Sequence, residues 1–395
     1  MSGMTALRIV ALAPNEWDGP WMNRQNLLSR LAGDHQILYS NGIWSSWQRT
    51  SAAYRRSPIL SRFEVRNGVS VDRRGRLLVR VARIGALDRL AIKAACLRWR
   101  GHLAGKPGPL VAYVFHPEFL PFVEAMGADY IVYHAYDLFR FMGLGGEAVE
   151  ASENTLLKLA DLVIATSRET AEDMRGRIDR RIEVLGNGVD LNRFLPDSQH
   201  AEPPELARIQ RPRVGYVGAV NQKVDLELML ELSRRRPGWQ FVFVGEIGNL
   251  GPGDAELISE MRSRENIHLI RPVDQNRLSG VLQNLDVGLV CYRMLRWTVA
   301  GYPLKMLEYL ACGLPVVASD LPAVRDFESV IAIAKSVDEW EASIEEALSG
   351  RGRGSSADRR AVARANNWDA RADQLNSLLQ EMVLSKSPEQ RYRTA

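Results

Sequence analysis

Short apolar runs alternate along the whole chain with longer stretches that mix apolar and polar residues. The runs are four to six residues long, as in strands buried on both faces, and the stretches between them repeat apolar residues at helical spacing. This alternation predicts an α/β fold in which helices cover both faces of parallel sheets. In the first half, the predicted strands are Arg8–Ala13, Gln36–Ser40, Leu110–Phe115, Tyr130–His134, Leu162–Ala165 and Ile182–Leu185.

A polar, Pro-rich stretch, Leu195–Pro204, interrupts this rhythm and is the best candidate for a linker. We therefore predict two doubly wound, Rossmann-like domains, over residues 1–198 and 205–368, with ligands at the carboxyl ends of both sets of strands. Residues 369–395 include the amphipathic stretch Ala370–Leu384, and we expect a closing helix there that packs back toward the N-terminal domain. The predicted strands of the second half are Arg213–Val217, Gln240–Val244, Ile267–Ile270, Val287–Cys291, Pro315–Ala318 and Val330–Ala334.

The composition is that of a soluble globular protein. With 395 residues the chain is too long for one ordinary core, and 46% hydrophobic and 25% charged residues are typical values. Three widely spaced cysteines indicate a reducing compartment, without a disulfide framework or a zinc pattern. The apolar run Ile9–Ala13 is too short for a signal peptide, and no uncharged stretch is long enough to span a bilayer. These features predict a cytoplasmic protein.

The positive charge is concentrated in residues 62–106. This segment holds twelve Lys/Arg and three Asp/Glu, so it carries +9, and the rest of the chain carries −5 of the overall +4. Within residues 76–100, basic residues recur among apolar ones near helical spacing, which predicts an amphipathic basic helix. Such a helix can lie on an anionic membrane surface, at the inner face of the cytoplasmic membrane, or can be an ordinary packed helix with a solvated basic face.

The segment Gly301–Ser319 carries the clearest chemical signal. Pro303 suits the first position of a helix, and Gly313 suits the left-handed stop just past its end. Free N–H groups at the helix start and the Lys305 ammonium would meet at one point, which suits a diphosphate. Glu308 lies one turn further on the same face, where its carboxylate can accept hydrogen bonds from two neighbouring ribose hydroxyls. A diphosphate and a ribose together predict a nucleotide, here a nucleotide sugar.

Other strand ends of the second half extend this predicted site. Gly218 permits close approach of the backbone, and Gly245 begins a glycine-rich loop whose N–H groups can contact phosphate or base. Lys223 either reaches a phosphate or is a solvated loop lysine, and Arg293 either binds the diphosphate or forms a surface ion pair. The predicted donor contacts are Lys305, Glu308, Pro303, Leu304, Tyr292, Arg293, Gly218, Lys223 and Gly245.

The loop after the first strand lacks the G-x-G-x-x-G pattern of dinucleotide-binding proteins, which argues against a dehydrogenase. Gly19 suits a tight turn. Trp17 and Trp21 either form a wall on which a sugar stacks or cap the core. The residues predicted to face an acceptor or the cleft are Trp17, Asp18, Gly19, Arg24 and His116.

Two polar residues follow strands of the first half. Asp137 comes after Tyr130–His134, where a carboxylate can act as a general base or can cap the following helix. His116 follows Leu110–Phe115 and is either an acid/base or acceptor contact or a hydrogen-bonded histidine at a strand end. No two of the six histidines have the spacing of metal ligands, so we predict no metal site.

Together these motifs resemble the bacterial GT-B glycosyltransferases that assemble cell-surface polysaccharides. The resemblance covers nearly the whole chain and implies two Rossmann-like domains that face a central cleft. It rests on Trp17-Asp18-Gly19-Pro20 with Arg24-Gln25, on Asn187-Gly188-Val189-Asp190 with Phe194, and on Pro303-x-Lys305-x-x-Glu308-Tyr309-x-Ala311-x-Gly313-x-Pro315-Val316-Val317.

The resemblance implies that the C-terminal domain binds the donor nucleotide and the N-terminal domain binds the acceptor. Lys305 and Glu308 fall on the family's phosphate and ribose contacts, and no metal or other cofactor is expected. Retaining members often carry E-x7-E, but the first position here is Ala300. The chain is more similar to the xanthan-type glucuronosyltransferases, which also lack that Glu, are inverting and use an aspartate of the N-terminal domain as base. This similarity favours Asp137 as the base.

We therefore expect a metal-independent, inverting glycosyltransferase of surface polysaccharide or exopolysaccharide synthesis. Its donor would be a nucleoside-diphosphate sugar, with UDP favoured, and its acceptor a hydroxyl of a glycan or lipid-linked glycan. No nucleic acid is expected as a partner. Two alternatives remain: a nucleotide-sugar epimerase on the same fold, and a catalytically silent subunit that binds nucleotide sugars.

Overall fold

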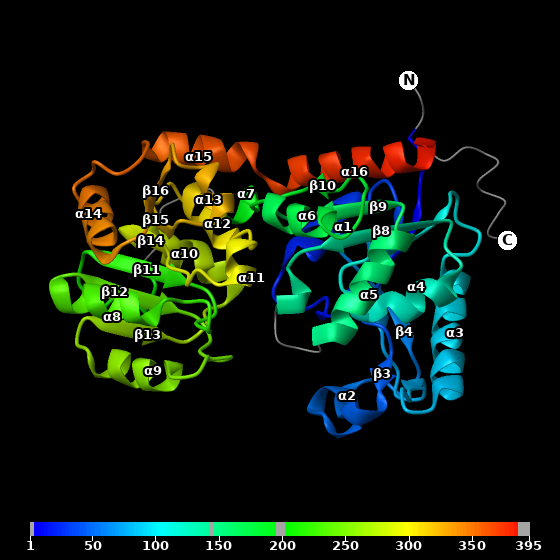
Figure 1. Cartoon of the computed structure of the whole chain (residues 1–395). Helices are drawn as coiled ribbons and strands as arrows, with labels where there is room; N and C mark the ends of the chain where they lie inside the picture. The colour runs from blue at the N-terminus through cyan, green and yellow to red at the C-terminus, as the bar shows by residue number, and fades with distance from the viewer. Residues whose placement is uncertain (1–3, 142–145, 195–201, 386–395) are drawn as a thin grey trace. The chain divides into compact units, whose positions relative to one another are not determined.

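The computed structural model describes residues 4–141, 146–194 and 202–385, which divide into two compact units (Figure 1). Unit 1 is Met1–Gly186 with Arg371–Ala395, and unit 2 is Asn187–Ala370. The division falls before the predicted boundary at residue 198, because Val189 and Phe194 belong to the buried core of unit 2. Of the predicted linker, residues 195–201 lie outside the described residues.

Unit 1 contains an eight-stranded sheet in the order β10-β9-β8-β7-β1-β2-β5-β4. All neighbours pair in parallel except β4 and β5. Strand β1 lies between β2 and β7, and the chain moves from β1 toward one edge of the sheet through β2 and toward the other edge from β7 onward. The switch point therefore lies between β1 and β7, and ligands of such sheets bind at the carboxyl ends of the strands at this point. The strands are β1 (Arg8–Leu12), β2 (Gln36–Ser40), β3 (Trp44–Ser45), β4 (Arg62–Arg66), β5 (Val69–Arg73), β6 (Val79–Arg80), β7 (Leu110–Val114), β8 (Tyr130–Ala135), β9 (Leu162–Ala165) and β10 (Glu183–Val184).

Helices cover this sheet, and β3 pairs with β6 in a small separate ribbon. Helix α3 packs against α4, and α4 packs against α5 (Figure 1). The helices of this part are α1 (Asn23–Leu31), α2 (Ala52–Arg56), α3 (Gly85–His102), α4 (Leu120–Met126), α5 (Gly146–Leu159) and α6 (Arg168–Arg175), with 3₁₀ turns η1 (Ser46–Thr50), η2 (Pro117–Phe119) and η3 (Phe139–Phe141).

Unit 2 has a six-stranded, all-parallel sheet in the order β13-β12-β11-β14-β15-β16. The connections change direction between β11 and β14, so this is where a ligand is expected. The strands are β11 (Arg213–Val217), β12 (Gln240–Val244), β13 (Ile267–Ile270), β14 (Val287–Val290), β15 (Val316–Ser319) and β16 (Ile331–Ala334).

The helices of unit 2 form two groups around its sheet. Helix α8 contacts α9 and α14, whereas α12 contacts α7 and α15. Among the described residues, no helix has the length and apolar character that a bilayer-crossing segment needs. The helices are α7 (Leu191–Phe194), α8 (Leu226–Arg235), α9 (Asp254–Ser263), α10 (Leu278–Gln283), α11 (Arg296–Val299), α12 (Leu304–Ala311), α13 (Pro322–Arg325), α14 (Val337–Leu348) and α15 (Ser356–Ala365), with the 3₁₀ turn η4 (Gln275–Arg277).

The last helix, α16 (Trp368–Ser385), begins in unit 2 and from Arg371 onward belongs to unit 1. Its side chains bond to the first residues of the chain, since the Gln380 amide both accepts from Thr5 N (2.9 Å) and donates to Thr5 O (3.0 Å). The Tyr130 hydroxyl donates to Val383 O at 3.3 Å. The helix therefore closes unit 1 with a segment from the far end of the sequence.

The predicted strands are all present, and none of their ends is shifted by more than one residue, but the basic segment differs from its prediction. Residues 76–84 are not helical, and α3 begins only at Gly85. Residues 62–73 form the β4–β5 hairpin, whose turn residues Asn67 (φ 50°) and Gly68 (φ 78°) are the pair that tight hairpins favour. The hairpin was missed because it is an edge ribbon with polar outer positions, so it has no continuous apolar run.

Candidate functional site

Helix α12 is held firmly at the switch point of unit 2. It begins at Leu304, so Pro303 is the N-cap residue and lies one position before its predicted place. The helix ends as predicted, because Gly313 adopts the left-handed φ of +75°. Val217 N, at the end of β11, donates a hydrogen bond to the Tyr309 hydroxyl at 2.9 Å. No side chain caps the start of α12, and no acidic residue lies in its first turn.

Lys305 projects from this helix into the interior of unit 2. Its residue surface is 8% exposed, and among the described residues its Nζ has no hydrogen-bond partner. The Nζ lies 3.3 Å from the centroid of the Tyr216 ring and 5.4 Å from that of Tyr292, which gives cation–π contacts but no anion. A buried amine without a counter-charge is costly unless a ligand supplies one.

The charge state of Lys305 reflects this position. Burial, and then the positive charge of Lys223, hold the pKa of the Lys305 amine well below its ordinary value. The Lys223 Nζ lies 5.1 Å from the centroid of the Tyr292 ring, which the Lys305 amine also faces. An oxyanion beside the Lys305 amine would favour its protonated form.

Two glycines beside Lys305 lie where a side chain would collide with neighbouring atoms. Gly218 has φ +136°, and a Cβ there would lie 2.8 Å from the Lys305 Nζ. Gly245 has φ +157°, and a Cβ there would overlap the Gly218 carbonyl oxygen. Any larger residue would therefore displace the lysine or the neighbouring strand end, so both positions keep the strand ends close to Lys305.

Glu308 lies one helical turn after Lys305 and is partly exposed. Burial raises the pKa of its carboxyl to about 6, against the lowering effect of Lys305 and Arg193. Within the described part of the chain, its carboxylate makes no hydrogen bond or ion pair. It is thus available to accept bonds from a ligand's hydroxyl groups.

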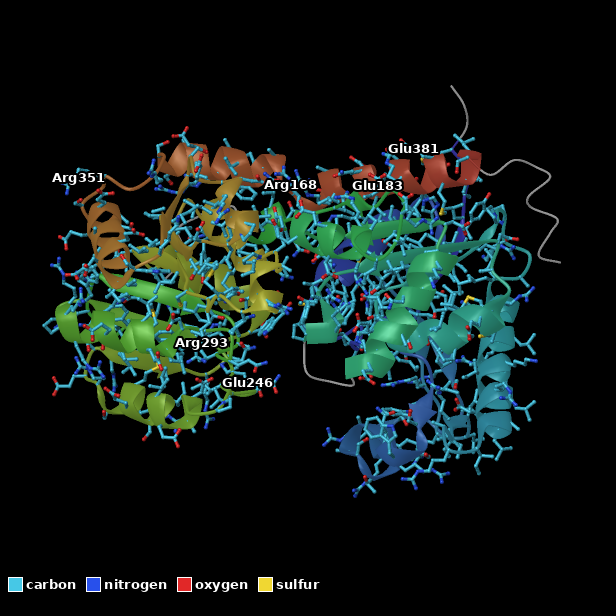
Figure 2. All side chains as sticks on the ribbon, in the orientation of Figure 1. Arg168, Glu183, Glu246, Arg293, Arg351 and Glu381 are labelled. Carbon is cyan, nitrogen blue, oxygen red and sulfur yellow. The ribbon has the colours of Figure 1, made fainter. Side chains whose placement is uncertain are left out.

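Arg293, labelled in Figure 2, has a partner already. Its Nη2 lies 2.8 Å from the Asp254 carboxylate, which is fully buried at the start of α9 and also accepts a hydrogen bond from Gly251 N at 2.8 Å. Arg293 N donates to Lys223 O at 2.7 Å. The predicted ion pair is therefore the role that the structure gives to Arg293: it ties together the loops that surround Lys305. This Arg293–Asp254 ion pair is more buried than the surface ion pair that the sequence predicts for Arg293.

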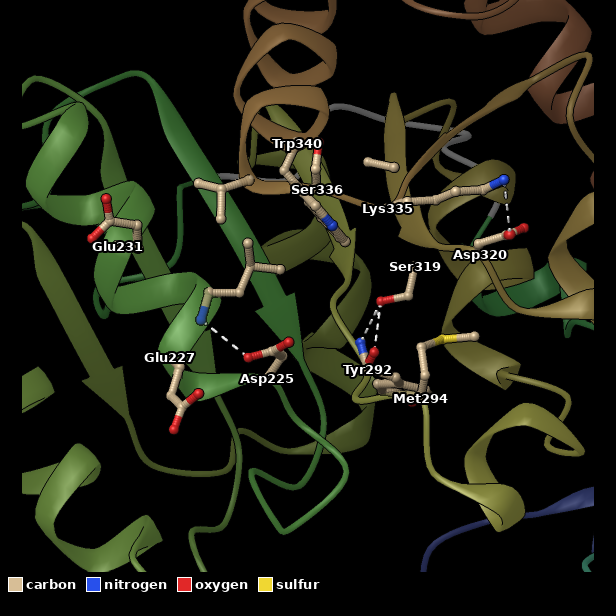
Figure 3. A pocket seen from close by; sticks show the side chains of 13 residues that line it. Asp225, Glu227, Glu231, Tyr292, Met294, Ser319, Asp320, Lys335, Ser336 and Trp340 are labelled. Carbon is tan, nitrogen blue, oxygen red and sulfur yellow. Dashed lines mark hydrogen bonds and ion pairs between the residues drawn. The ribbon is translucent and has the colours of Figure 1, made fainter.

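A separate hollow of about 700 Å³ lies at the carboxyl ends of β14, β15 and β16 (Figure 3). Four carboxylates line it, and one of them, Asp320, pairs with Lys335 at 3.3 Å. An excess of carboxylates repels a diphosphate, so we place the candidate nucleotide site on the Lys305 side of Tyr292 and not in this hollow. Its acidic residues are Asp225, Glu227, Glu231 and Asp320.

In unit 1, the loop after β1 is largely structural. Trp17 is 1% exposed and packs edge-on against Tyr39 at 5.0 Å, so it caps the core and offers no open wall to a sugar. Asp18 is exposed and pairs with Arg73 at 2.6 Å. Gly19 N closes a tight turn by donating to Glu16 O at 3.2 Å.

Arg24 lies in the first turn of α1 and is 1% exposed. Its Cζ lies 4.4 Å from the centroid of the Tyr136 ring and 6.0 Å from that of Phe115. These rings follow β8 and β7, so the guanidinium lies near the switch point of the unit 1 sheet. Among the described residues it forms no ion pair, and its Nε and Nη1 are buried without a hydrogen-bond partner.

His116 directly precedes η2, at the same sheet edge. Its Nδ1 accepts a hydrogen bond from Glu118 N at 3.2 Å, so the proton of the neutral ring is on Nε2. Burial, and then the charge of Arg24, lower the pKa of His116 to about 4. At neutral pH, this side chain therefore offers a ligand an N–H donor and not a basic nitrogen.

Asp137 follows β8 by two residues and is partly exposed. The next helical turn, η3, begins at Phe139, so Leu138 and not Asp137 precedes it directly. Burial raises the pKa of Tyr136 to about 12 against the lowering effect of Arg24, and the charge of the adjacent Asp137 adds to the rise. The candidate base therefore lies in the same neighbourhood as Arg24.

The structure adds residues that sequence reasoning missed. Tyr216 underlies the Lys305 amine, Asp254 holds Arg293, and Tyr136 covers Arg24. His134, fully buried, accepts or donates to the Tyr113 hydroxyl at 2.7 Å. Tyr216 and His134 are strand residues and look like ordinary core positions, but Tyr136 stands beside Asp137 in a strand-end motif, which is a signal that could have found it.

Comparison with known families assigns each unit separately. Residues 50–193 match the family described as Glycosyltransferase Family 4, and residues 211–350 match the family described as Glycosyl transferases group 1. Together the two matches cover more than two thirds of the chain. Both candidate sites have their central residues, Asp137 and Lys305, inside the matched ranges.

Relatives are consistent with these matches. The lipopolysaccharide core biosynthesis mannosyltransferase LpsB of Rhizobium meliloti is 30% identical over 179 residues, covering 42% of this chain and 48% of that protein. A Bacillus subtilis protein named for teichuronic acid biosynthesis is 23% identical over 180 residues, covering 45% of each chain. The chain thus spans about half the length of these curated relatives.

A solved structure gives the same result for the fold. Sucrose-phosphate synthase from Thermosynechococcus elongatus aligns with a TM-score of 0.72 at 15% identity, over 96% of this chain and all of that one. The matched families and named relatives concern glycosyl transfer, which argues against the epimerase alternative. Residues 50–193 and 211–350 therefore match glycosyltransferase family models, and the fold is that of sucrose-phosphate synthase, in agreement with the resemblance that the motifs carry.

Proposed function

We propose that the protein transfers a sugar from a nucleoside-diphosphate sugar, with UDP as the favoured nucleotide, to a hydroxyl of a glycan or lipid-linked glycan. Unit 2 binds the donor and unit 1 binds the acceptor. Relatives named for teichuronic acid and lipopolysaccharide core biosynthesis support a role in surface polysaccharide assembly.

The observation that carries the proposal is the unpaired Lys305 amine at the switch point of unit 2. A diphosphate placed there receives the Lys305 charge and the open N–H groups at the start of α12. Glu308 lies one turn away, where its carboxylate can accept from both ribose hydroxyls. Phosphate and ribose contacts at this spacing specify a ribonucleotide.

In the proposed reaction, the acceptor oxygen forms a bond to the anomeric carbon while the bond from that carbon to the diphosphate breaks. The acceptor proton passes to Asp137, and the diphosphate leaves with the electron pair. Lys305 stabilises the charge that develops on the leaving group, so we propose that the reaction needs no metal and inverts the anomeric centre. His116 donates from Nε2 and orients the acceptor.

Calorimetry with UDP, GDP and dTDP, followed by transfer assays with the matching sugars and a panel of lipid-linked saccharides, tests the proposal. We expect UDP to bind most tightly and its sugar to be transferred. Binding without transfer to any acceptor would favour the silent subunit instead, and absence of nucleotide binding would contradict the whole assignment.

We further propose that unit 1 contacts an anionic bilayer through an apolar–basic surface formed by residues 47–100. Nine of the fourteen exposed large apolar residues of the described chain lie in this segment. On α3, Leu90 (64% exposed), Lys93 and Leu97 (67% exposed) follow one another at helical spacing on its exposed side. Leucines beside cations suit insertion at the headgroup level of an anionic membrane.

The apolar–basic surface is tested by sedimentation with vesicles of phosphatidylglycerol or of phosphatidylcholine. Wild type should bind the former, and the double variant Leu90→Ser, Lys93→Glu should bind at least about tenfold more weakly. Lys158→Glu, at an exposed position of α5, is the charge-matched control. Equal binding by all three proteins, or equal binding to both lipids, would contradict the proposal.

A further inference from the structure

Unit 1 contains a charged group that the proposed reaction does not use. The Arg24 guanidinium is almost completely buried, lacks an ion pair among the described residues, and leaves Nε and Nη1 without acceptors. Burial of a charge without an ion-pair partner raises the free energy of the folded protein. A guanidinium stays protonated at all physiological pH values, so Arg24 cannot avoid this penalty by losing its proton.

Among the described residues, none of the groups around Arg24 forms an ion pair with it. His116 and His134 have pKa values lowered to about 4 and about 3, chiefly by burial and then by the Arg24 charge, so both rings are neutral. His134 Nε2 is also buried without a partner in the described part of the chain. Within the described ranges no ion pair joins Arg24 to a carboxylate; Glu118 lies 3.7 Å from His116 Nδ1, and Asp137 has contacts of its own.

A buried water could accept hydrogen bonds from these nitrogens, but it would leave the positive charge uncompensated. An oxyanion satisfies both requirements, because each of its oxygens accepts hydrogen bonds and its charge balances the guanidinium. The planar fork of Arg suits the oxygen pairs of carboxylates and phosphates. The location at the switch point of the unit 1 sheet is where such a ligand binds.

We propose that Arg24 binds an oxyanion, a phosphate or carboxylate, carried by the acceptor. The inference rests on the proposed function in taking the unit 1 ligand to be the acceptor. It narrows the acceptor to an anionic one: either a glycan that contains a uronic acid or a saccharide attached to a lipid phosphate or diphosphate. Asp137, close to the Tyr136 ring that covers Arg24, would then meet a hydroxyl near the anchored anion.

The test measures thermal unfolding of the full chain in the presence of inorganic phosphate, D-glucuronate or neutral D-glucose. All proteins carry Lys305→Met, which removes the other candidate oxyanion site, so the outcome does not depend on donor binding. UDP binding by the protein without that change reports separately on the proposed function. The variants compared are Arg24→Met, Arg24→Lys and the control Arg181→Met, whose side chain is 78% exposed.

We expect phosphate or glucuronate, but not glucose, to raise the melting temperature of the parent and of Arg181→Met. Arg24→Met should weaken the apparent affinity at least tenfold, and Arg24→Lys should weaken it less. Without an anion, Arg24→Met should melt no lower than the parent, because it removes an uncompensated charge. A response to phosphate alone indicates a lipid phosphate, and a response to glucuronate alone indicates a uronic acid.

Equal stabilisation of the parent and Arg24→Met by the anions, or no stabilisation of either, would overturn the proposal. So would a lower melting temperature of Arg24→Met together with an unchanged anion response, since that result assigns Arg24 a structural role only. Should Arg24→Met fail to fold, Arg24→Lys decides: an affinity equal to that of the parent would contradict recognition by the guanidinium fork.

Discussion

In the described part of the chain, each unit has a buried cation that forms no ion pair at its sheet's switch point, but the two cations differ in kind. Unit 2 uses Lys305, whose pKa is held well below its ordinary value, whereas unit 1 uses Arg24, which stays charged. A bound diphosphate would favour the protonated form of the Lys305 amine. The guanidinium carries its charge throughout, so the unit 1 site favours an anion at every physiological pH.

This difference matches what each ligand does in the proposed reaction. The diphosphate leaves after transfer, and a lysine that can share or release a proton suits a group whose charge changes. An acceptor anion would be a fixed anchor whose charge does not change, and a rigid fork suits it. Four substitutions test this difference between the two cations, and they follow in order of decreasing effect.

Asp137→Asn should lower the rate of transfer about 1,000-fold while leaving UDP binding unchanged, because an amide cannot take the acceptor proton. The measurement is transfer from the UDP-sugar alongside UDP calorimetry. Asp179→Asn, at an exposed position of unit 1, is the matched control. Full activity of Asp137→Asn would remove this residue as the base and leave unit 1 with a binding role only.

Lys305→Met should weaken UDP binding about 100-fold, because it removes a charge-assisted contact in a desolvated position. Lys335→Met, which loses only an exposed pairing with Asp320, should bind UDP like wild type. Calorimetry measures both. Unchanged affinity in Lys305→Met would show that the diphosphate lies elsewhere, and the parallel between the two cations would fail.

Arg293→Met tests the contrast between a paired and an unpaired cation within unit 2. It leaves the buried Asp254 carboxylate without its partner and should lower the free energy of unfolding by about 2 kcal/mol. Lys305→Met should lower it by much less, because its amine has no partner to lose. Urea denaturation of both variants and of the exposed control Arg351→Met measures the difference. The reverse order of stabilities would contradict the assigned roles.

Glu308→Gln should weaken UDP binding about tenfold at pH 7 and abolish the preference for UDP over 2′-deoxy-UDP, because the ionised carboxylate accepts from both hydroxyls. The Glu308 pKa is raised to about 6 in the folded protein, so wild-type affinity should fall as the pH drops through 6 and the carboxylate is protonated. The variant should lack this step. A pH-dependence that is the same in both proteins would exclude Glu308 as the ribose contact.

The same raised pKa has a smaller consequence for stability. Between pH 4.5 and about 6, the folded protein holds a proton on Glu308 that the unfolded chain releases, so ionisation destabilises the fold as the pH rises through this range. Above pH 6, Glu308→Gln should therefore be more stable than wild type by about 1–2 kcal/mol without ligand. Thermal unfolding at pH 5 and pH 8 measures this difference.

The sequence predicts the two sheets well because their strands are buried on both faces and form continuous apolar runs. The β4–β5 hairpin has no such run, and only its Asn67-Gly68 turn could have revealed it. Lys305 and Glu308 are predictable because their spacing on one helix face is local. The Arg293–Asp254 pair, and the burial of Arg24 without an ion pair among the described residues, depend on tertiary packing, which no local pattern specifies.

The return of α16 to unit 1 has a consequence for how the chain folds during synthesis. Unit 2 is one continuous segment, residues 187–370, whereas unit 1 also needs residues from Arg371 onward, so only unit 2 can complete its contacts without them. The earlier half must wait with the surface that receives α16 uncovered. A truncated protein that ends near residue 370 would consequently retain all of unit 2 and leave unit 1 without the helix that closes it.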